Sequence, residues 1–167
     1  MKKISNLILN NDIFIFDLDK TIWNCYDSGG NSIWAKNLER NTFIRITNNL
    51  VIDKHNSICI LHDGIRETLE LLEKKDKKIG FLSVGALLDI KYEQQPSVDL
   101  LRTFGIYEYF NFNNYLLYKT KEKDPYLKQY EKCVFFDDDE KHLDKVRDID
   151  SITEIDRKSF LSWKQLI

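Results

Sequence analysis

Three short runs of apolar residues constrain the fold of this chain more than any other feature. They occupy residues 12–17 (DIFIFD), 78–83 (KIGFLS) and 133–138 (CVFFDD) of a chain of 167 residues. Each run is continuous, whereas a strand with one face in water alternates apolar and polar side chains. The runs therefore predict strands that are covered on both faces, as in a parallel sheet.

Helical patterns lie between these runs. The segment 64–75 spaces Ile65, Leu69 and Leu72 along one stripe, with charged residues opposite. Strands that alternate with helices indicate an α/β fold with a doubly wound parallel sheet. We expect further helices at residues 96–105, 124–132, 139–149 and 158–167, with Asp124 and Asp139 as N-caps, and weaker strands at 109–113 and 151–155.

Residues 22–62 interrupt this alternation. They contain a turn-rich piece, DSGGNS, and a stretch that predicts a β-hairpin turning near Asn48 and Asn49. A chain of 167 residues is long enough for one well-buried domain and too short for two ordinary ones. We therefore expect a single domain, residues 1–167, in which residues 22–62 form a substrate-facing flap.

Charge and cysteine content narrow the class of protein. A formal net charge of −2 provides no global field for a phosphate backbone, so nucleic acid is not an expected partner. The apolar run near the N-terminus is too short for a signal peptide or a membrane span, which favours a cytoplasmic protein without membrane contact. Cys25, Cys59 and Cys133 are scattered, and we expect them to be reduced and buried.

The functional side chains follow the ends of the predicted strands. Asp17 and Asp19 end the first run, Ser83 ends the second, and Asp137 and Asp138 end the third. Ligands of such sheets bind beyond the carboxyl ends of the strands, so these acids should meet at one edge. Like charges that crowd together repel unless a cation neutralises them, and hard oxygen ligands select Mg²⁺. The sequence therefore predicts a magnesium site suited to phosphate chemistry.

These motifs carry a resemblance to a known family. DLDKT resembles the DxDx(T/V) signature of the haloacid dehalogenase superfamily, and a serine, a lysine and FFDD follow in that superfamily's order. Within it, FDLDKTIW, LHDGIRETLELL, FLSVG and CVFFDDDEKHL resemble the magnesium-dependent phosphatase-1 family, over about residues 12–149. The resemblance implies a three-layer α/β/α sandwich, Rossmann-like, with a small β-hairpin flap instead of a large cap.

The resemblance also implies roles for individual residues. Asp17 would be the nucleophile that forms a phosphoaspartyl intermediate, and Asp19 the general acid and then the general base. Asp17, the main-chain carbonyl of Asp19, and Asp138 with its neighbour Asp137 would hold Mg²⁺. Thr21 and Ser83 would position the phosphate.

The family needs one lysine beside the nucleophile and the phosphoryl group. Lys119, Lys121 and Lys123 all stand in YKTKEKDPYL. We favour Lys123 because it directly precedes Asp124, the expected start of a helix, where anions are favoured. Lys121 is the second choice. The other lysines would belong to a solvated loop.

The function implied is that of a magnesium-dependent phosphomonoesterase, whose substrate would be a small phosphorylated metabolite such as a sugar phosphate, or a phosphoprotein, including phosphotyrosine. The intact Asp19 favours hydrolysis. The alternative is a non-hydrolytic phosphate-binding or carrier-loading module, resembling the glyceryl-transferring relatives in the superfamily.

Two groups of residues have a less definite interpretation. The histidines are too scattered to form a ligand set and are expected at the surface or in local hydrogen bonds, His142 among them. Trp23, Tyr26 and Trp34 follow the nucleophile closely. They could line a substrate entrance or pack in the core.

Overall fold

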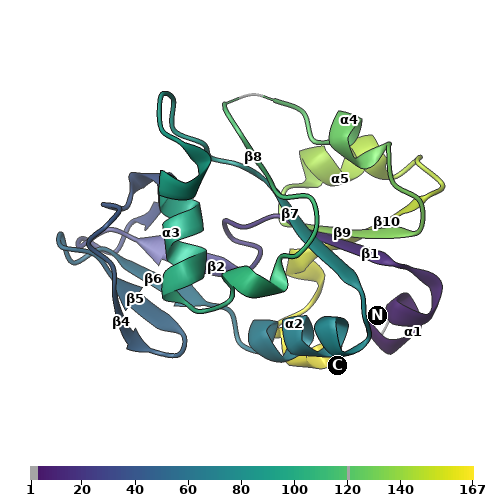
Figure 1. Ribbon diagram of the computed structural model, residues 1–167, viewed down its shortest axis with the longest axis horizontal. Helices are drawn as coiled ribbons and strands as arrows, with labels where there is room; N and C mark the ends of the chain where they lie inside the picture. Colours follow the sequence, from purple (N-terminus) through teal and green to yellow (C-terminus); the bar gives the residue numbers. More distant parts are fainter. Residues whose placement is uncertain (1–3, 120) are drawn as a thin grey trace.

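A computed structural model describes residues 4–119 and 121–167 (Figure 1). Its centre is a five-stranded sheet with the strand order β10-β9-β1-β7-β8, in which all neighbours are parallel. The α/β class and the parallel sheet predicted from the apolar runs are confirmed. The strands are β1 (Ile13–Phe16), β7 (Lys78–Val84), β8 (Tyr115–Leu117), β9 (Cys133–Asp137) and β10 (Ile152–Asp156).

Apolar clusters cover both faces of this sheet, which explains why the strand runs are continuous. Phe14 and Phe16 of β1 belong to one cluster, whereas Ile13 belongs to the other, because side chains alternate along a strand. The first cluster includes side chains of α1 (Ile4–Asn10), α2 (Ile65–Lys74) and α3 (Pro96–Thr103), and the second those of α4 (Asp124–Leu127) and α5 (Glu140–Val146).

A second sheet is built by the segment between β1 and α2. It is antiparallel, with the order β3-β2-β6-β5-β4, and lies beside α3 at the left of Figure 1. The hairpin predicted near Asn48 and Asn49 is confirmed, since these residues join β4 to β5. The hairpin is only part of the segment, which forms a five-stranded antiparallel sheet. Its strands are β2 (Trp23–Tyr26), β3 (Ser32–Ile33), β4 (Ile44–Thr47), β5 (Leu50–Ile52) and β6 (Ile58–Leu61).

Two sequence predictions about elements are wrong. Residues 109–113 do not form a strand, and the edge strand β8 begins two residues later. The closing helix expected at 158–167 is replaced by two 3₁₀ turns, η4 (Arg157–Ser159) and η5 (Trp163–Gln165). Asp156 and Ser162 cap these turns, because each side chain accepts a hydrogen bond from the main chain two residues on.

The second turn brings a large aromatic side chain beneath the central strands. Trp163 is fully buried, and its ring packs in tilted orientation against Phe16 and Phe136, with 5.5 Å and 5.0 Å between ring centroids. Its indole N–H donates to the main-chain oxygen of Thr21 at 3.3 Å. The loop that follows β1 therefore rests on Trp163.

The N-cap residues of α4 and α5 can be compared with the predicted ones. Asp139 is the N-cap of α5, as predicted, because its side chain accepts a hydrogen bond from the main-chain N–H of Lys141 at 3.0 Å. The predicted N-cap of the preceding helix, Asp124, is wrong by one residue. Lys123, not Asp124, is the N-cap residue of α4, which is a single short turn.

All three cysteines are buried as predicted, but the prediction that they are reduced is wrong for two of them. Cys25 of β2 and Cys59 of β6 stand opposite each other in antiparallel register, with 4.1 Å between Cα atoms, and form a disulfide. Only Cys133 is free, as expected. The sequence gives no sign of this pairing because it depends on the register of two strands that lie 34 residues apart. Among the described helices, none has the length and apolar character needed to cross a membrane.

Candidate active site

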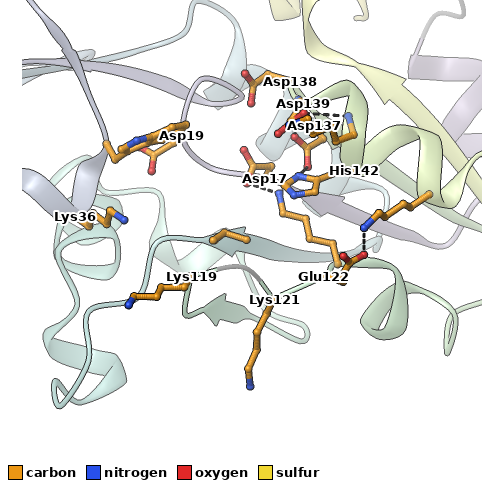
Figure 2. Close-up of a pocket in the computed structure, with 15 residues that line it drawn as sticks. Asp17, Asp19, Lys36, Lys119, Lys121, Glu122, Asp137, Asp138, Asp139 and His142 are labelled. Carbon is orange, nitrogen blue, oxygen red and sulfur yellow. Dashed lines mark hydrogen bonds and ion pairs between the residues drawn. The ribbon is translucent and has the colours of Figure 1, made fainter.

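The carboxyl edge of the parallel sheet gathers acidic residues predicted from the sequence. Strand β1 pairs in register with β7 on one side and β9 on the other, so Phe16 lies beside both Phe81 and Phe136. The next residues, Asp17 and Asp137, therefore reach the same edge of the sheet. They line a cavity of about 540 Å³ that also contains several lysine side chains (Figure 2).

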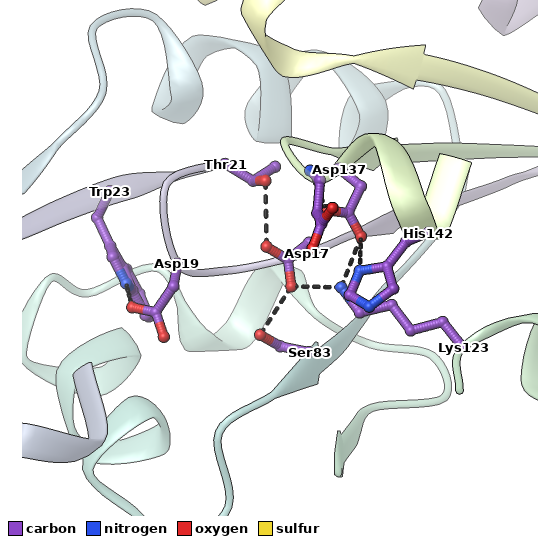
Figure 3. A network of polar contacts seen from close by, with 9 residues as sticks. Asp17, Asp19, Thr21, Trp23, Ser83, Lys123, Asp137 and His142 are labelled. Carbon is purple, nitrogen blue, oxygen red and sulfur yellow. Dashed lines mark hydrogen bonds and ion pairs between the residues drawn. The ribbon is translucent and has the colours of Figure 1, made fainter. Parts of the chain in front are cut away.

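Asp17 is contacted by three side chains. Its Oδ1 atom accepts hydrogen bonds from Lys123 Nζ at 2.7 Å and from Ser83 Oγ at 2.9 Å (Figure 3). Its Oδ2 atom accepts one from Thr21 Oγ1 at 3.2 Å. All four side chains are buried. The structure thus brings together residues up to 106 positions apart that the family resemblance assigned to one site.

Lys123 is the lysine that reaches the acids. Its ammonium nitrogen lies 2.7 Å from Asp17 Oδ1 and 2.6 Å from Asp137 Oδ2, and only 2% of the side chain is exposed. Burial alone would lower the pKa of Lys123, but the two carboxylates outweigh burial and raise that pKa above its ordinary value. The lysine therefore stays charged. Lys119 and Lys121 are exposed and lie at the mouth of the cavity.

Both oxygens of Asp137 have partners within the protein. Besides Lys123, its Oδ2 atom lies 3.0 Å from His142 Nδ1, and its Oδ1 atom accepts the main-chain N–H of Asp139 at 2.9 Å. Burial would raise the pKa of Asp137, but His142 and Lys123 outweigh it and lower the pKa below its ordinary value. Asp137 is therefore held ionised and in a fixed orientation.

Asp17, Asp137 and Asp138 form a group that fits a metal ion. One oxygen from each carboxylate lies within 4.8 Å of the others. Three carboxylates against the single ammonium of Lys123 leave two negative charges, which one divalent cation would cancel. Burial and the charges of Asp17 and Asp137 raise the pKa of Asp138 to about 6. Oxygen ligands of this kind suit Mg²⁺.

Asp19 lies apart from this group and is bound to the antiparallel sheet segment. Its Oδ1 atom accepts hydrogen bonds from Trp23 Nε1 at 2.8 Å and from the main-chain N–H of Ala35 at 2.9 Å. Burial outweighs both bonds and raises the pKa of Asp19 to about 6. Such a carboxyl group can donate and accept a proton near neutral pH. Its side chain is outside the three-acid group, and the resemblance assigns only its main-chain carbonyl to the metal.

His142 was expected at the surface or in a local hydrogen bond, and the structure shows such a contact within the site. Its ring lines the cavity and contacts Asp137, with 24% of the side chain exposed. The sequence signal that could have placed His142 in the site was its position in the helix predicted at residues 139–149. Once Asp139 is the N-cap, the third helical residue turns back over the strand end.

The two tryptophans have different positions. Trp23 is fully buried and reaches the site only through its hydrogen bond to Asp19. Trp34 is 45% exposed and lines the cavity, so of the two it is the one that a ligand can touch.

Comparison with known proteins adds no assignment. No protein-family model matches the chain, and no curated protein sequence matches it.

Proposed function

We propose that this protein is a magnesium-dependent phosphomonoesterase of the haloacid dehalogenase type. The single observation that carries the proposal is the surroundings of Asp17. One buried carboxylate is in contact with the ammonium of Lys123 and the hydroxyls of Ser83 and Thr21, next to a group of acids that fits a divalent cation. Phosphoryl transfer needs these elements, namely a positioned nucleophile and charge neutralisation around the transferred group.

The proposed fold follows the same superfamily. The parallel sheet, with apolar clusters on both faces, supports the proposal of a three-layer α/β/α Rossmann-like domain. The antiparallel sheet segment would act as the flap, since Trp34 from this segment lines the cavity and Ala35 binds Asp19. The chain would then be one domain with an inserted flap.

In the first step of the proposed reaction, a carboxylate oxygen of Asp17 attacks the phosphorus atom. The bond between phosphorus and the ester oxygen breaks, and Asp19 gives its proton to that oxygen, so the alcohol leaves neutral. The raised pKa of Asp19 favours this role because the carboxyl group holds its proton to a higher pH than an exposed aspartate. Asp17 then carries the phosphoryl group.

In the second step, Asp19 takes a proton from a water molecule. The water oxygen attacks the phosphorus atom, the bond to Asp17 breaks, and inorganic phosphate leaves. Lys123 keeps its charge through both steps and offsets the negative charge beside Asp17. Mg²⁺ held by Asp17, Asp137 and Asp138 would supply further positive charge next to the phosphoryl group.

The test is hydrolysis of 4-nitrophenyl phosphate, with Mg²⁺ and with a chelator. Phosphate release that needs the metal is expected, together with a loss of about a thousandfold or more in kcat for Asp17→Asn. Asp12→Asn is the matched control, because Asp12 is exposed at the opposite end of β1. If the wild-type protein released no phosphate with Mg²⁺, the proposal would be wrong. Binding of esters without release would instead favour the non-hydrolytic phosphate-binding module.

A further inference from the structure

The cavity carries more positive charge than the reaction centre uses. Four lysines surround its mouth: Lys36 from the antiparallel sheet segment, Lys119 and Lys121 from the loop after β8, and Lys141 from α5. We call these four residues the rim lysines. Figure 2 shows Lys36, Lys119 and Lys121 on the side of the cavity away from Asp138. We call the side of the cavity with Asp17, Asp137 and Asp138 its floor, and the side with these three lysines its mouth.

The rim lysines share one cavity, and none of them forms an ion pair within the described part of the chain. Across residues 4–119 and 121–167, no carboxylate lies within 4.0 Å of a rim lysine's amino group, whereas Lys145, in the same cavity, pairs with Glu122. On the far side of the molecule, Lys164 pairs with Asp63 at 2.8 Å. The rim therefore retains positive charge that no protein group in contact offsets.

The acids on the floor do not offset it either. Lys123 and a divalent cation together balance Asp17, Asp137 and Asp138. Among the other lining acids, Glu122 pairs with Lys145, so Asp19 and Asp139 remain against the four rim lysines and leave two positive charges. Once the metal is bound, the positive charge at the mouth is available to a ligand that already places its phosphoryl group on the floor.

The size of the cavity allows such a second contact. At about 540 Å³ it lies in the range of pockets that enclose whole small molecules, roughly 300–1,000 Å³. A phosphoryl group alone fills only part of it. The remainder of the substrate must therefore extend from the floor past Trp34 and the rim lysines.

We propose that the preferred substrate is a small phosphomonoester whose leaving group carries a second anionic group, a carboxylate or a phosphate, bound by the rim lysines. This inference rests on the proposed function and adds the substrate class. Lys36 and Lys119 are the main contacts, because they line the cavity from different segments of the chain. The concave, partly enclosed cavity favours a small molecule over an extended phosphopeptide.

The test compares two open-chain esters with the same reacting phosphate. In 6-phosphogluconate the far carbon is a carboxylate, and in sorbitol 6-phosphate it is an alcohol. One exposed ion pair contributes up to about fivefold in affinity, so kcat/KM for 6-phosphogluconate should be higher by up to about fivefold for each ion pair formed, mainly through KM. The ratio should fall as salt is added, since exposed charges are screened.

The double variant Lys36→Gln/Lys119→Gln should bring this ratio close to one. The matched control is Lys74→Gln/Lys75→Gln, which removes the same charge from the exposed end of α2 and should keep the wild-type ratio. An unchanged ratio in the rim variant would overturn the proposal. An acidic phosphopeptide that is hydrolysed better than 6-phosphogluconate would overturn it too.

A binding measurement separates this inference from the proposed function. In the Asp17→Asn variant with Mg²⁺, 6-phosphogluconate should raise the midpoint of thermal unfolding more than sorbitol 6-phosphate does. If wild type released no phosphate from 4-nitrophenyl phosphate or from either ester but the shifts differed, the phosphatase proposal would fail, while binding of the second anionic group by the rim lysines would stand. Equal hydrolysis of both esters with equal shifts would overturn the rim proposal and leave the phosphatase proposal intact.

Discussion

Replacing Asp138 by asparagine is expected to stabilise the metal-free protein and to abolish its response to Mg²⁺. Burial and the neighbouring acids raise the pKa of Asp138 from 3.8 to about 6, so the ionised form is disfavoured in the folded state. At 1.36 kcal/mol per pKa unit this corresponds to about 3 kcal/mol. Because Asp138 is only partly buried, solvent screening reduces the value to about 1–2 kcal/mol.

The gain in free energy of unfolding from Asp138→Asn should depend on pH, because it arises from the raised pKa of Asp138. A carboxyl group with a raised pKa in the folded state destabilises the fold where it is ionised in both states, above about pH 6. Below about pH 4 it is protonated in both states and has no effect. The gain in Asp138→Asn should therefore be full at about pH 7.5 and disappear as the pH falls from about 6 to 4.

The assay is thermal unfolding with and without Mg²⁺ at several pH values. In a protein of this size, about 1 kcal/mol moves the midpoint by about 2–4 °C, so a rise of a few degrees is expected in the metal-free variant. Wild type should gain stability from Mg²⁺ and the variant should not. Asp139→Asn is the matched control, since it removes the adjacent charge and asparagine still caps α5. A lower midpoint for Asp138→Asn, or an equal Mg²⁺ response, would refute the reasoning.

Three further predictions concern Lys123, Trp23 and the cysteines. Lys123→Met should lower the free energy of unfolding by about 3–5 kcal/mol in urea titrations without metal, because two buried carboxylates lose their cation; a loss below 1 kcal/mol would contradict this. Trp23→Phe removes a hydrogen bond that favours the ionised form of the proposed general acid, so the alkaline limb of kcat/KM should move to higher pH, and an unmoved limb would argue against that role. In denaturant without reductant, alkylation should label Cys133 alone, and after reduction also Cys25 and Cys59; three labels before reduction would exclude the disulfide.

The three adjacent strands β9, β1 and β7 were predictable because they are read directly from continuous apolar runs. Asp17, Ser83 and Asp137 follow or end those strands, so a parallel register was enough to predict that they meet. Lys123 was chosen for its place at a helix start. It does lie there, as the N-cap residue itself, with its amino group on Asp17.

The parts that were missed depend on contacts between distant segments. The bonds from Trp23 and Ala35 to Asp19 exist only because the antiparallel sheet segment folds back on the end of β1. The disulfide between Cys25 and Cys59 needs the register of β2 with β6. Pattern and propensity describe one element at a time, and they carry no information about such register.

The position of Trp163 under the loop after β1 has a consequence for folding during synthesis. Its indole N–H binds the main-chain oxygen of Thr21, which precedes it by 142 residues. At about 5–20 residues per second, a ribosome needs roughly 7–28 s to cover that distance. During this interval the nascent chain holds the loop of Thr21 without its aromatic support, and Phe16 lacks the neighbour that later packs against its ring. Asp17 and Asp19 are thus synthesised early but reach their final geometry only after residue 163 has left the exit tunnel.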